Sequence, residues 1–135
     1  MKRVILIVDD EERILFVLQN VLTRLDNGLE VVTAATAEEG LQKVTDTPFD
    51  LVITDLIMPD MDGIELTERV RGLDNDVPVV WMTAYGCESF KPEAERLGVA
   101  WCLEKPLEIG EFREVARRAM AAAGKEADSA EAAGS

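Results

Sequence analysis

The stretch Val4–Asp10, which reads VILIVDD, decides the fold. Five apolar residues, most of them β-branched and with no polar residue between them, are typical of a parallel strand buried on both faces. The strand ends abruptly at Asp9 and Asp10, and apolar residues at helical spacing follow as far as Leu25. The stretch therefore predicts a buried strand that leads directly into a helix.

The same alternation continues along the chain. Further strands are predicted at residues 30–34, 49–54, 77–82 and 100–103. The second helix opens at the capping box Thr36–Glu39, the third follows Gly63, and the last carries an apolar stripe from Phe112 to Ala119. Alternating strands and helices predict an α/β fold, a doubly wound five-stranded parallel sheet covered on both sides by five helices.

The fourth helix is restricted by Pro92, because proline is tolerated in the first turn of a helix but not in its interior. We expect this helix to begin near Pro92 and to end at about Leu97. Residues 84–91 are then a long loop, and we expect phosphorylation to order the segment 84–97.

Composition predicts one domain over residues 1–121 and a disordered tail over residues 122–135, which is acidic and rich in Ala, Gly and Ser. The apolar runs are strand-sized and too short to cross a membrane or to form a signal peptide, so we expect a cytoplasmic protein without membrane contact.

The chain has 27 acidic and 14 basic residues, a formal net charge of −13, and no histidine. The negative charge disfavours direct contact with nucleic acid. The absence of histidine excludes Ser-His-Asp triads, His–Cys zinc sites and phosphohistidine on this chain. Cys87 and Cys102 lack metal-type spacing, and we expect buried free thiols rather than a disulfide or a redox site.

Polar residues stand where the predicted strands end. Asp9 and Asp10 follow the first strand, Asp55 the third, Thr83 the fourth and Lys105 the fifth. The carboxyl ends of parallel strands form the ligand-binding edge of such a sheet, so these side chains are expected to converge there. Three carboxylates, one hydroxyl and one ammonium suit a phosphoryl group together with a hard cation.

The chemistry of this set can be stated residue by residue. Neighbouring carboxylates repel one another unless a cation neutralises them, and an oxygen-only ligand set favours Mg²⁺. Asp55 can then act as the nucleophile that forms an acyl phosphate. Lys105 and the Thr83 hydroxyl can each bind a phosphoryl oxygen.

Four motifs in this order resemble the response-regulator receiver family of two-component phosphorelay systems, which includes the chemotaxis response regulator. The motifs are Val8–Asp10, Thr54–Gly63, Met82–Ala84 and Leu103–Pro106. The resemblance covers the chain from Lys2 to about Ala121. It implies the flavodoxin-like strand order 2-1-3-4-5 and a switch that catalyses only its own phosphorylation and dephosphorylation.

Carried onto this sequence, the resemblance makes Asp55 the phosphoryl acceptor and Mg²⁺ the cofactor. Asp10 is implied as a direct metal ligand, and Asp9 as a ligand or the holder of a metal-bound water. The remaining implied features are the Ile57 backbone carbonyl as a metal ligand, Thr83 as the switch hydroxyl, Lys105 as the phosphoryl-binding lysine and a cis peptide before Pro106.

The resemblance also assigns Ile57 and Tyr85 to positions that tune the lifetime of the phosphoryl group, and their bulk predicts a long-lived acyl phosphate. The family usually has an aromatic residue three positions before the lysine, but Cys102 stands there, beside Trp101. Neighbouring side chains on a strand point to opposite faces, so we do not expect Trp101 simply to replace that aromatic residue. Asp60 and Asp62 are interpreted as turn residues.

The implied partners are a histidine kinase or histidine phosphotransfer protein and an output domain or partner protein, with a phosphorylation-dependent dimer left open. An aspartyl-phosphate hydrolase would need a D-x-D signature, but residue 57 is Ile. A flavin binder would need a phosphate cradle rich in Gly or Ser/Thr, and no such stretch appears in the sequence. A scaffold that is never phosphorylated does not explain why the whole set is present: Asp10, Asp55, Thr83 and Lys105.

Overall fold

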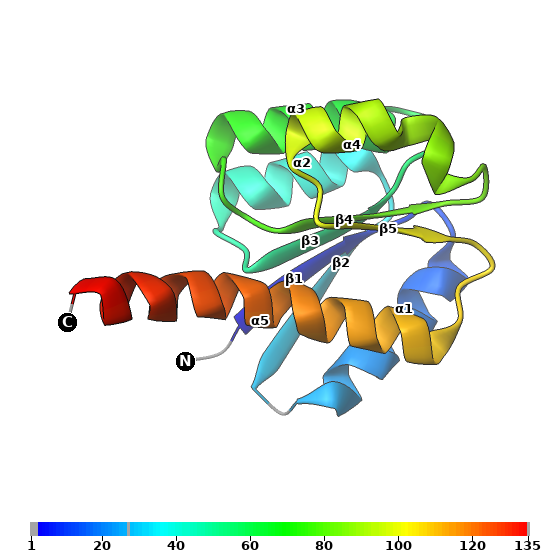
Figure 1. Cartoon of the computed structure of the whole chain (residues 1–135). Coiled ribbons are helices and arrows are strands. Elements are labelled where there is room, and N and C mark those ends of the chain that lie inside the picture. Colours follow the sequence, from blue (N-terminus) through cyan, green and yellow to red (C-terminus); the bar gives the residue numbers. More distant parts are fainter. Residues whose placement is uncertain (1–2, 27, 135) are drawn as a thin grey trace.

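The computed structural model describes residues 3–26 and 28–134, with side chains up to residue 121. In this part of the chain, five parallel strands form one sheet in the order β2-β1-β3-β4-β5, which confirms the predicted fold class (Figure 1). The strands are β1 (Arg3–Val8), β2 (Leu29–Ala34), β3 (Leu51–Asp55), β4 (Val79–Thr83) and β5 (Trp101–Glu104).

Helices cover both faces of the sheet. They are α1 (Glu12–Leu25), α2 (Ala37–Asp46), α3 (Gly63–Leu73), the 3₁₀ helix η1 (Cys87–Phe90), α4 (Lys91–Leu97) and α5 (Ile109–Gly134). Figure 1 shows α1 and α5 on one face and α2, α3 and α4 on the other.

The two covered faces explain the unbroken apolar run of β1. Ile5 and Ile7 are buried against the side of α1 and α5, and Leu6 and Val8 are buried in the cluster on the side of α2 and α3. Successive side chains of a strand point to opposite faces, so a strand covered on both sides has no position left for a polar residue.

The Thr36 cap predicted for α2 is present, but the Glu39 side chain bonds the residue before the cap and not the cap itself. The Thr36 hydroxyl accepts a hydrogen bond from the Glu39 backbone N–H at 3.0 Å, and the Glu39 carboxylate accepts one from the Ala35 N–H at 2.7 Å. The first bond satisfies a backbone donor that a helix N-terminus leaves unpaired, so α2 begins where the sequence predicts.

The fourth helix also follows the prediction. It spans Lys91–Leu97, with Pro92 in its first turn. It stops at Gly98, whose φ of 66° is the left-handed conformation that glycine adopts easily. The sequence predicts a loop over residues 84–91, but residues 87–90 form the 3₁₀ turn η1.

The last helix buries Phe112, Ala116 and Ala119 against the sheet. Helix is assigned as far as Gly134, through residues 122–134 where the composition predicts a disordered tail. Residues 1, 2 and 135 lie outside the described residues, and the division into a domain and a tail stays a prediction. None of the helices in the described part of the chain has the length and apolar character needed to cross a lipid bilayer.

The expectation of two free thiols is wrong, because Cys87 and Cys102 form a disulfide. Their Cα atoms are 5.8 Å apart, a usual separation for bridged cysteines. The pair lies on η1 and β5, and the contact arises because η1 folds back beside the edge strand. A separation of 15 residues along the chain carries no sign of this fold-back.

Candidate functional site

Strand register aligns the predicted site residues at one edge of the sheet. Val8 of β1 pairs with Thr54 of β3, and Asp9 and Asp55 are the residues that directly follow this pair. Asp55 pairs with the residue before Thr83 in β4, and Thr83 pairs with the residue before Lys105 in β5. The four side chains therefore start from neighbouring points on one sheet edge.

Lys105 joins two of the carboxylates. Its ammonium nitrogen donates to Asp9 Oδ2 at 2.8 Å and to Asp55 Oδ2 at 3.1 Å. A third carboxylate oxygen, from Glu11, lies 3.8 Å away. The Asp9 side chain is fully buried, and those of Asp55 and Lys105 are 9% and 12% exposed. Charge-assisted hydrogen bonds of this kind are stronger than neutral ones, so the lysine holds both acids in place.

Burial and pairing act in opposite directions on this group. Burial raises the pKa of Asp9, although the hydrogen bonds from Lys105 and from the Glu11 backbone N–H partly offset the effect. Burial alone would lower the pKa of Lys105, but the bonds and charges of Asp9 and Asp55 outweigh it and raise that pKa. The lysine is therefore firmly charged, and Asp9 depends on that charge to remain ionised.

The backbone behind Asp55 requires a glycine. The Gly63 N–H donates to the Leu56 carbonyl at 2.7 Å, which draws the start of α3 against the end of β3. A Cβ atom at residue 63 would overlap the Asp55 carbonyl oxygen and lie 2.9 Å from Leu56 Cα. Glycine alone allows this close approach, so Gly63 sets the position of the Asp55 backbone.

Three carboxylates form a cluster that could hold a metal ion. One oxygen from each of Asp9, Asp10 and Asp55 lies within 4.8 Å of the others. Asp9 and Asp55 are buried, whereas Asp10 is exposed. An all-oxygen donor set of this charge fits a hard divalent cation such as Mg²⁺.

Comparison with known proteins identifies the family. The family model for the response regulator receiver domain matches residues 5–117. The chain belongs to the response regulator receiver family. Receivers of this family act as signalling switches in two-component systems and bind Mg²⁺ through acidic residues.

Relatives include short and long proteins. Sporulation initiation phosphotransferase F of Bacillus subtilis is 36% identical over 118 residues, which are 87% of this chain and 94% of that protein. Response regulator protein PilR of Pseudomonas aeruginosa is 33% identical over 125 residues, 93% of this chain but 28% of that protein. The CheY-like response regulator receiver domain protein of Methanospirillum hungatei superposes with a TM-score of 0.86 at 31% identity, covering 93% of this chain and 99% of the other.

Thr83 of the receiver is fully buried at the end of β4. Its hydroxyl oxygen accepts a hydrogen bond from the Tyr85 backbone N–H at 3.0 Å. Because a hydroxyl also carries one donor proton, Thr83 can still donate to a second group. Its role as a switch stays a prediction.

The two residues assigned to lifetime tuning are on the surface of the receiver. The side chains of Ile57 and Tyr85 have exposed fractions of 47% and 67%. The Ile57 N–H lies 3.5 Å from Asp55 Oδ1, a long contact. Metal coordination by the Ile57 carbonyl and control of lifetime by both residues stay predictions.

Asp60 and Asp62 have structural contacts, in line with their interpretation as turn residues. Asp62 is the N-cap of α3 and accepts the Glu65 N–H at 2.7 Å. Asp60 accepts the Glu38 N–H at 3.0 Å and the Ala37 N–H at 3.4 Å, at the start of α2. These backbone bonds lower the pKa of Asp60. The sequence does not predict this contact, because the two segments are distant along the chain.

The structure gives the conformation of the Lys105–Pro106 peptide bond and the directions of the Trp101 and Cys102 side chains. The Lys105–Pro106 peptide bond is cis, as the resemblance implied. Trp101 packs against the cluster on the α1 and α5 side, and Cys102 packs against the opposite cluster. Trp101 therefore points away from the face that Cys102 occupies.

Proposed function

We propose that this receiver accepts a phosphoryl group on Asp55, with Mg²⁺ held by Asp9, Asp10 and the Ile57 carbonyl. The observation that supports it most directly is the double contact of Lys105 with Asp9 and Asp55 at the sheet edge. A lysine in this position can bind the negatively charged oxygens of a phosphoryl group as it is attached to Asp55.

Burial favours Asp55 over the other two acids as the acceptor. Asp9 has no exposed side-chain surface, so a phosphoryl donor cannot reach it. Asp10 is exposed, but no hydrogen bond or ion pair to Lys105 is formed by it among the described residues. Asp55 is partly accessible to a donor and is also bonded to Lys105. A nucleophile needs the first to react, and the second stabilises the acyl phosphate that forms.

In the proposed step, a carboxylate oxygen of Asp55 attacks the phosphorus of a phosphohistidine on the donor protein. The P–N bond breaks, and its electron pair returns to the imidazole as the acyl phosphate forms. A bound Mg²⁺ would offset the charge of the carboxylates. Lys105 then holds a phosphoryl oxygen while keeping its contact with Asp9.

Thr83 couples the phosphoryl group to the loop that follows β4. Its hydroxyl accepts from the Tyr85 N–H, which leaves its own proton to donate to a phosphoryl oxygen. A shift of the hydroxyl towards Asp55 therefore moves the Tyr85 backbone as well. The switch is thus a change in the segment from Ala84 to η1, which a partner can read.

The assignment of Asp55 is tested by incubating the full chain with acetyl phosphate and MgCl₂ and measuring its intact mass. We expect the mass of one phosphoryl group to be added in the wild-type chain and in Asp46→Asn, a control at an exposed aspartate. Asp55→Asn should gain nothing, and omission of MgCl₂ should abolish the gain in the wild-type chain and in Asp46→Asn. A phosphoryl group retained by Asp55→Asn would refute the assignment.

Ile57 and Tyr85 shield the acyl phosphate from water in this proposal, since both bulky side chains are exposed and stand two residues after Asp55 and Thr83. The double variant Ile57→Asn/Tyr85→Ser should therefore lose its phosphoryl group faster than the wild type. Leu73→Asn is the control, because Leu73 is similarly exposed at 54% but lies at the end of α3. Equal decay rates in all three chains would contradict the shielding role.

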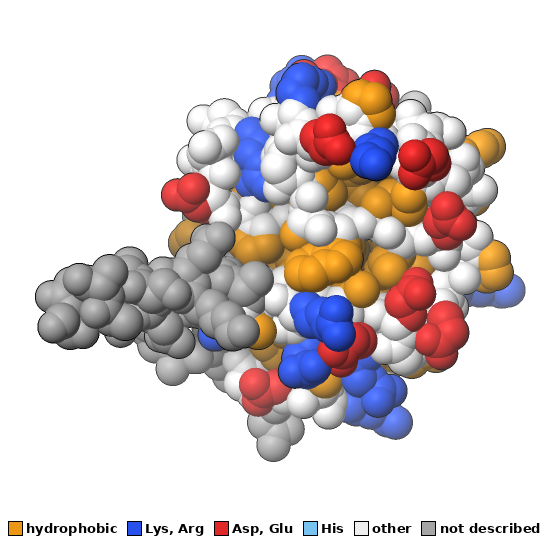
Figure 2. Space-filling model, in the orientation of Figure 1, with side chains coloured by type: hydrophobic (Ala, Val, Ile, Leu, Met, Phe, Trp, Pro, Cys, Tyr) orange, Lys and Arg blue, Asp and Glu red, His pale blue; other side chains and the backbone are white. Residues whose placement is uncertain are grey.

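The partners follow from the same chemistry. The donor is a histidine kinase or a histidine phosphotransfer protein in the cytoplasm, and an output domain or partner protein, or a phosphorylation-dependent dimer, receives the signal. The formal net charge of −13 disfavours direct contact with nucleic acid. Figure 2 agrees, because on that face acidic side chains lie beside the basic ones.

A further inference from the structure

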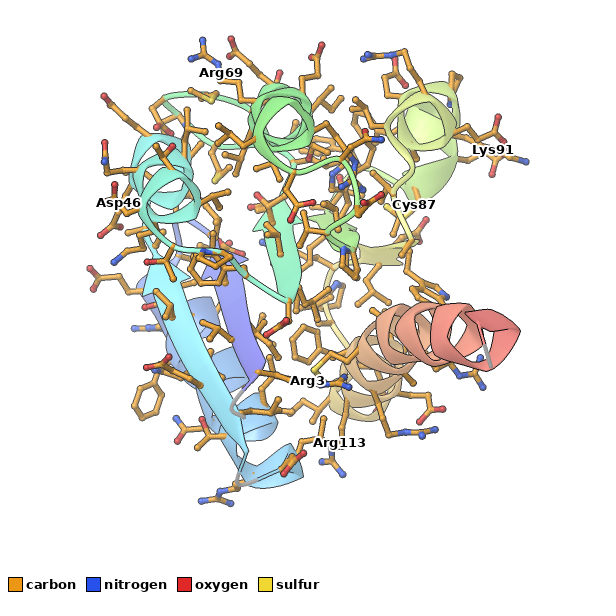
Figure 3. The ribbon with its side chains drawn as sticks, turned by 90° about the vertical axis from the view of Figure 1, so that its left-hand side faces the viewer. Arg3, Asp46, Arg69, Cys87, Lys91 and Arg113 are labelled. Carbon is orange, nitrogen blue, oxygen red and sulfur yellow. A yellow bond between two sulfur atoms is a disulfide. The ribbon has the colours of Figure 1, made fainter. Side chains whose placement is uncertain are left out.

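Cys87 and Cys102 are the two cysteines of the chain, and the structure joins them. Cys87 opens η1, and Cys102 lies on β5, the edge strand. Figure 3 shows Cys87 beside α4. Both residues are only partly buried, so small thiols and disulfides can reach them from solvent. With no other cysteine present, the chain offers each sulfur one intramolecular partner.

The disulfide connects the segment that leaves the phosphoryl site after Thr83 to the strand that leads into it before Lys105. Cys87 lies four residues after Thr83, and Cys102 lies three residues before Lys105. The Cys87 backbone N–H also donates to the Glu104 carboxylate at 3.0 Å, which is a second link from η1 to β5. At its other end, the loop is bound to Thr83 through the Tyr85 N–H. The loop from Thr83 to Cys87 is therefore held at both ends.

The rest of the fold does not depend on this disulfide. Two large buried clusters, one on each face of the sheet, contain residues from every strand and supply the core of the domain. A chain of 135 residues buries enough apolar surface to fold without covalent links. The disulfide encloses η1 and α4, and a seven-residue helix such as α4 has little stability of its own. Its removal should change the mobility of that segment and leave the sheet intact.

We propose that Cys87 and Cys102 are a reversible oxidation site that controls movement of the segment from Ala84 to Leu97. In the disulfide form the segment is fixed to β5, and in the dithiol form it is free to respond to phosphorylation. The assignment of a reversible oxidation site rests on the positions of the two cysteines alone. The coupling to phosphorylation rests on the proposed function of Asp55.

The oxidant is a small disulfide or a disulfide-bearing protein. One protein thiolate attacks it to form a mixed disulfide and releases one thiol. The second protein thiolate then attacks the first protein sulfur, which forms the Cys87–Cys102 bond and releases the second thiol. The chain loses two electrons and two protons, and the oxidant gains them as two thiols.

Coupling between the two modifications must be reciprocal. If the disulfide restrains a movement that phosphorylation requires, phosphorylation must equally favour the dithiol over the disulfide. Oxidation is then a signal that the receiver combines with phosphorylation on the same loop.

The redox site is tested on the full chain equilibrated with mixtures of reduced and oxidised glutathione. Remaining thiols are alkylated with iodoacetamide and counted by intact mass. We expect two alkylated cysteines under reducing conditions and none under oxidising conditions, in one transition without a stable glutathione adduct. Cys87→Ser and Cys102→Ser should instead each accumulate one glutathione. Two free thiols under oxidising conditions, or a disulfide that excess dithiothreitol cannot reduce in the native chain, would overturn the proposal.

The coupling is tested by hydrogen exchange across residues 84–97, with and without acetyl phosphate and MgCl₂. We expect phosphorylation to change exchange in the reduced wild-type chain and to leave it unchanged in the oxidised chain. Cys87→Ser/Cys102→Ser should respond like the reduced chain in both buffers. An equal change in both redox states would overturn the coupling while leaving the thiol titration to decide the redox site. Absence of any phosphoryl gain would overturn the proposed function and the coupling together, again independently of the thiol titration.

Discussion

Replacement of Lys105 by Met should expose how strongly the buried acids depend on one ammonium group. Methionine keeps the length and apolar stem of the side chain but removes its charge. Among the side chains that the structure describes, no other cation then lies within hydrogen-bond distance of Asp9, and the nearby Asp55 carboxylate adds to its electrostatic cost. We expect the variant to fold with a lower free energy of unfolding at neutral pH.

The distances set the size of the effect. At 2.8 Å, and with an effective dielectric constant of about 20, the attraction between Lys105 and Asp9 amounts to roughly 6 kcal/mol. Desolvation of both groups cancels part of this attraction. Removing one partner of a buried ion pair therefore costs about 3–5 kcal/mol, most of it from the charge left behind. Lys105 is 12% exposed, which favours the lower end of that range.

The cost must depend on pH, because it comes from ionised Asp9. Burial already raises the pKa of Asp9 above its ordinary value of 3.8, and removal of the lysine raises it further. An acid with a raised pKa in the folded state destabilises the fold progressively as the pH rises from the ordinary pKa to the raised one, and fully above it. The loss of stability in Lys105→Met should therefore be largest near neutral pH and shrink as the pH falls towards 3.8.

Urea unfolding in the absence and presence of MgCl₂ measures these effects. Mg²⁺ should stabilise Lys105→Met more than the wild type, because the cation replaces the missing ammonium. Asp9→Asn/Lys105→Met should recover most of the lost stability, and Lys91→Met, at an exposed lysine of α4, should lose little. A loss below about 1 kcal/mol, or a loss that does not change with pH, would refute the reasoning.

Three further substitutions test contacts around the site. Gly63→Ala should lower the free energy of unfolding by about 1–3 kcal/mol and slow phosphorylation, because the added Cβ overlaps the Asp55 carbonyl oxygen. Denaturant unfolding measures the first effect and intact mass the second. Unchanged values would contradict the close approach. Thr67→Val should cost about 1–3 kcal/mol, because it leaves the buried Trp81 N–H without its acceptor at 2.8 Å, whereas Thr67→Ser should cost less; equal losses would count against the hydrogen bond. Asp60→Ala should cost about 1 kcal/mol, because the Ala37 and Glu38 N–H groups in the first turn of α2 lose their carboxylate acceptor while the Thr36 cap remains. Since the pKa of Asp60 is lowered, its contribution to stability is present above pH 3.8 and is lost as the pH falls below that value. Urea unfolding should therefore show a difference between the wild type and Asp60→Ala at neutral pH but not at acidic pH.

The sheet and its functional edge were predictable because they depend on local patterns. Runs such as Val4–Val8 show which segments are buried on both faces, and the polar residue after each run marks where the strand ends. Parallel pairing then brings Asp9, Asp55, Thr83 and Lys105 to neighbouring positions without any further information. Pro92 likewise indicated a short fourth helix.

Contacts that depend on how loops fold were not predictable. The bond from Asp60 to the start of α2 joins residues 22 positions apart, and no local pattern announces it. The Cys87–Cys102 bond depends on the path of η1 beside β5. The relative burial of Asp9 and Asp10 depends on which way each side chain leaves the end of β1, which a two-residue acidic motif does not specify.

The two tryptophans give this protein separate optical probes for the two faces of its sheet. Trp81 is fully buried on the side of α3, with its indole N–H bonded to Thr67, so its emission should be that of an indole shielded from water. Trp101 is partly exposed on the opposite side, near α5, and should emit at longer wavelength. Trp81 is also paired across the strands with Cys102, and a disulfide quenches a nearby indole. The blue component of the emission should therefore brighten on reduction, which makes the oxidation state of the chain visible without a label.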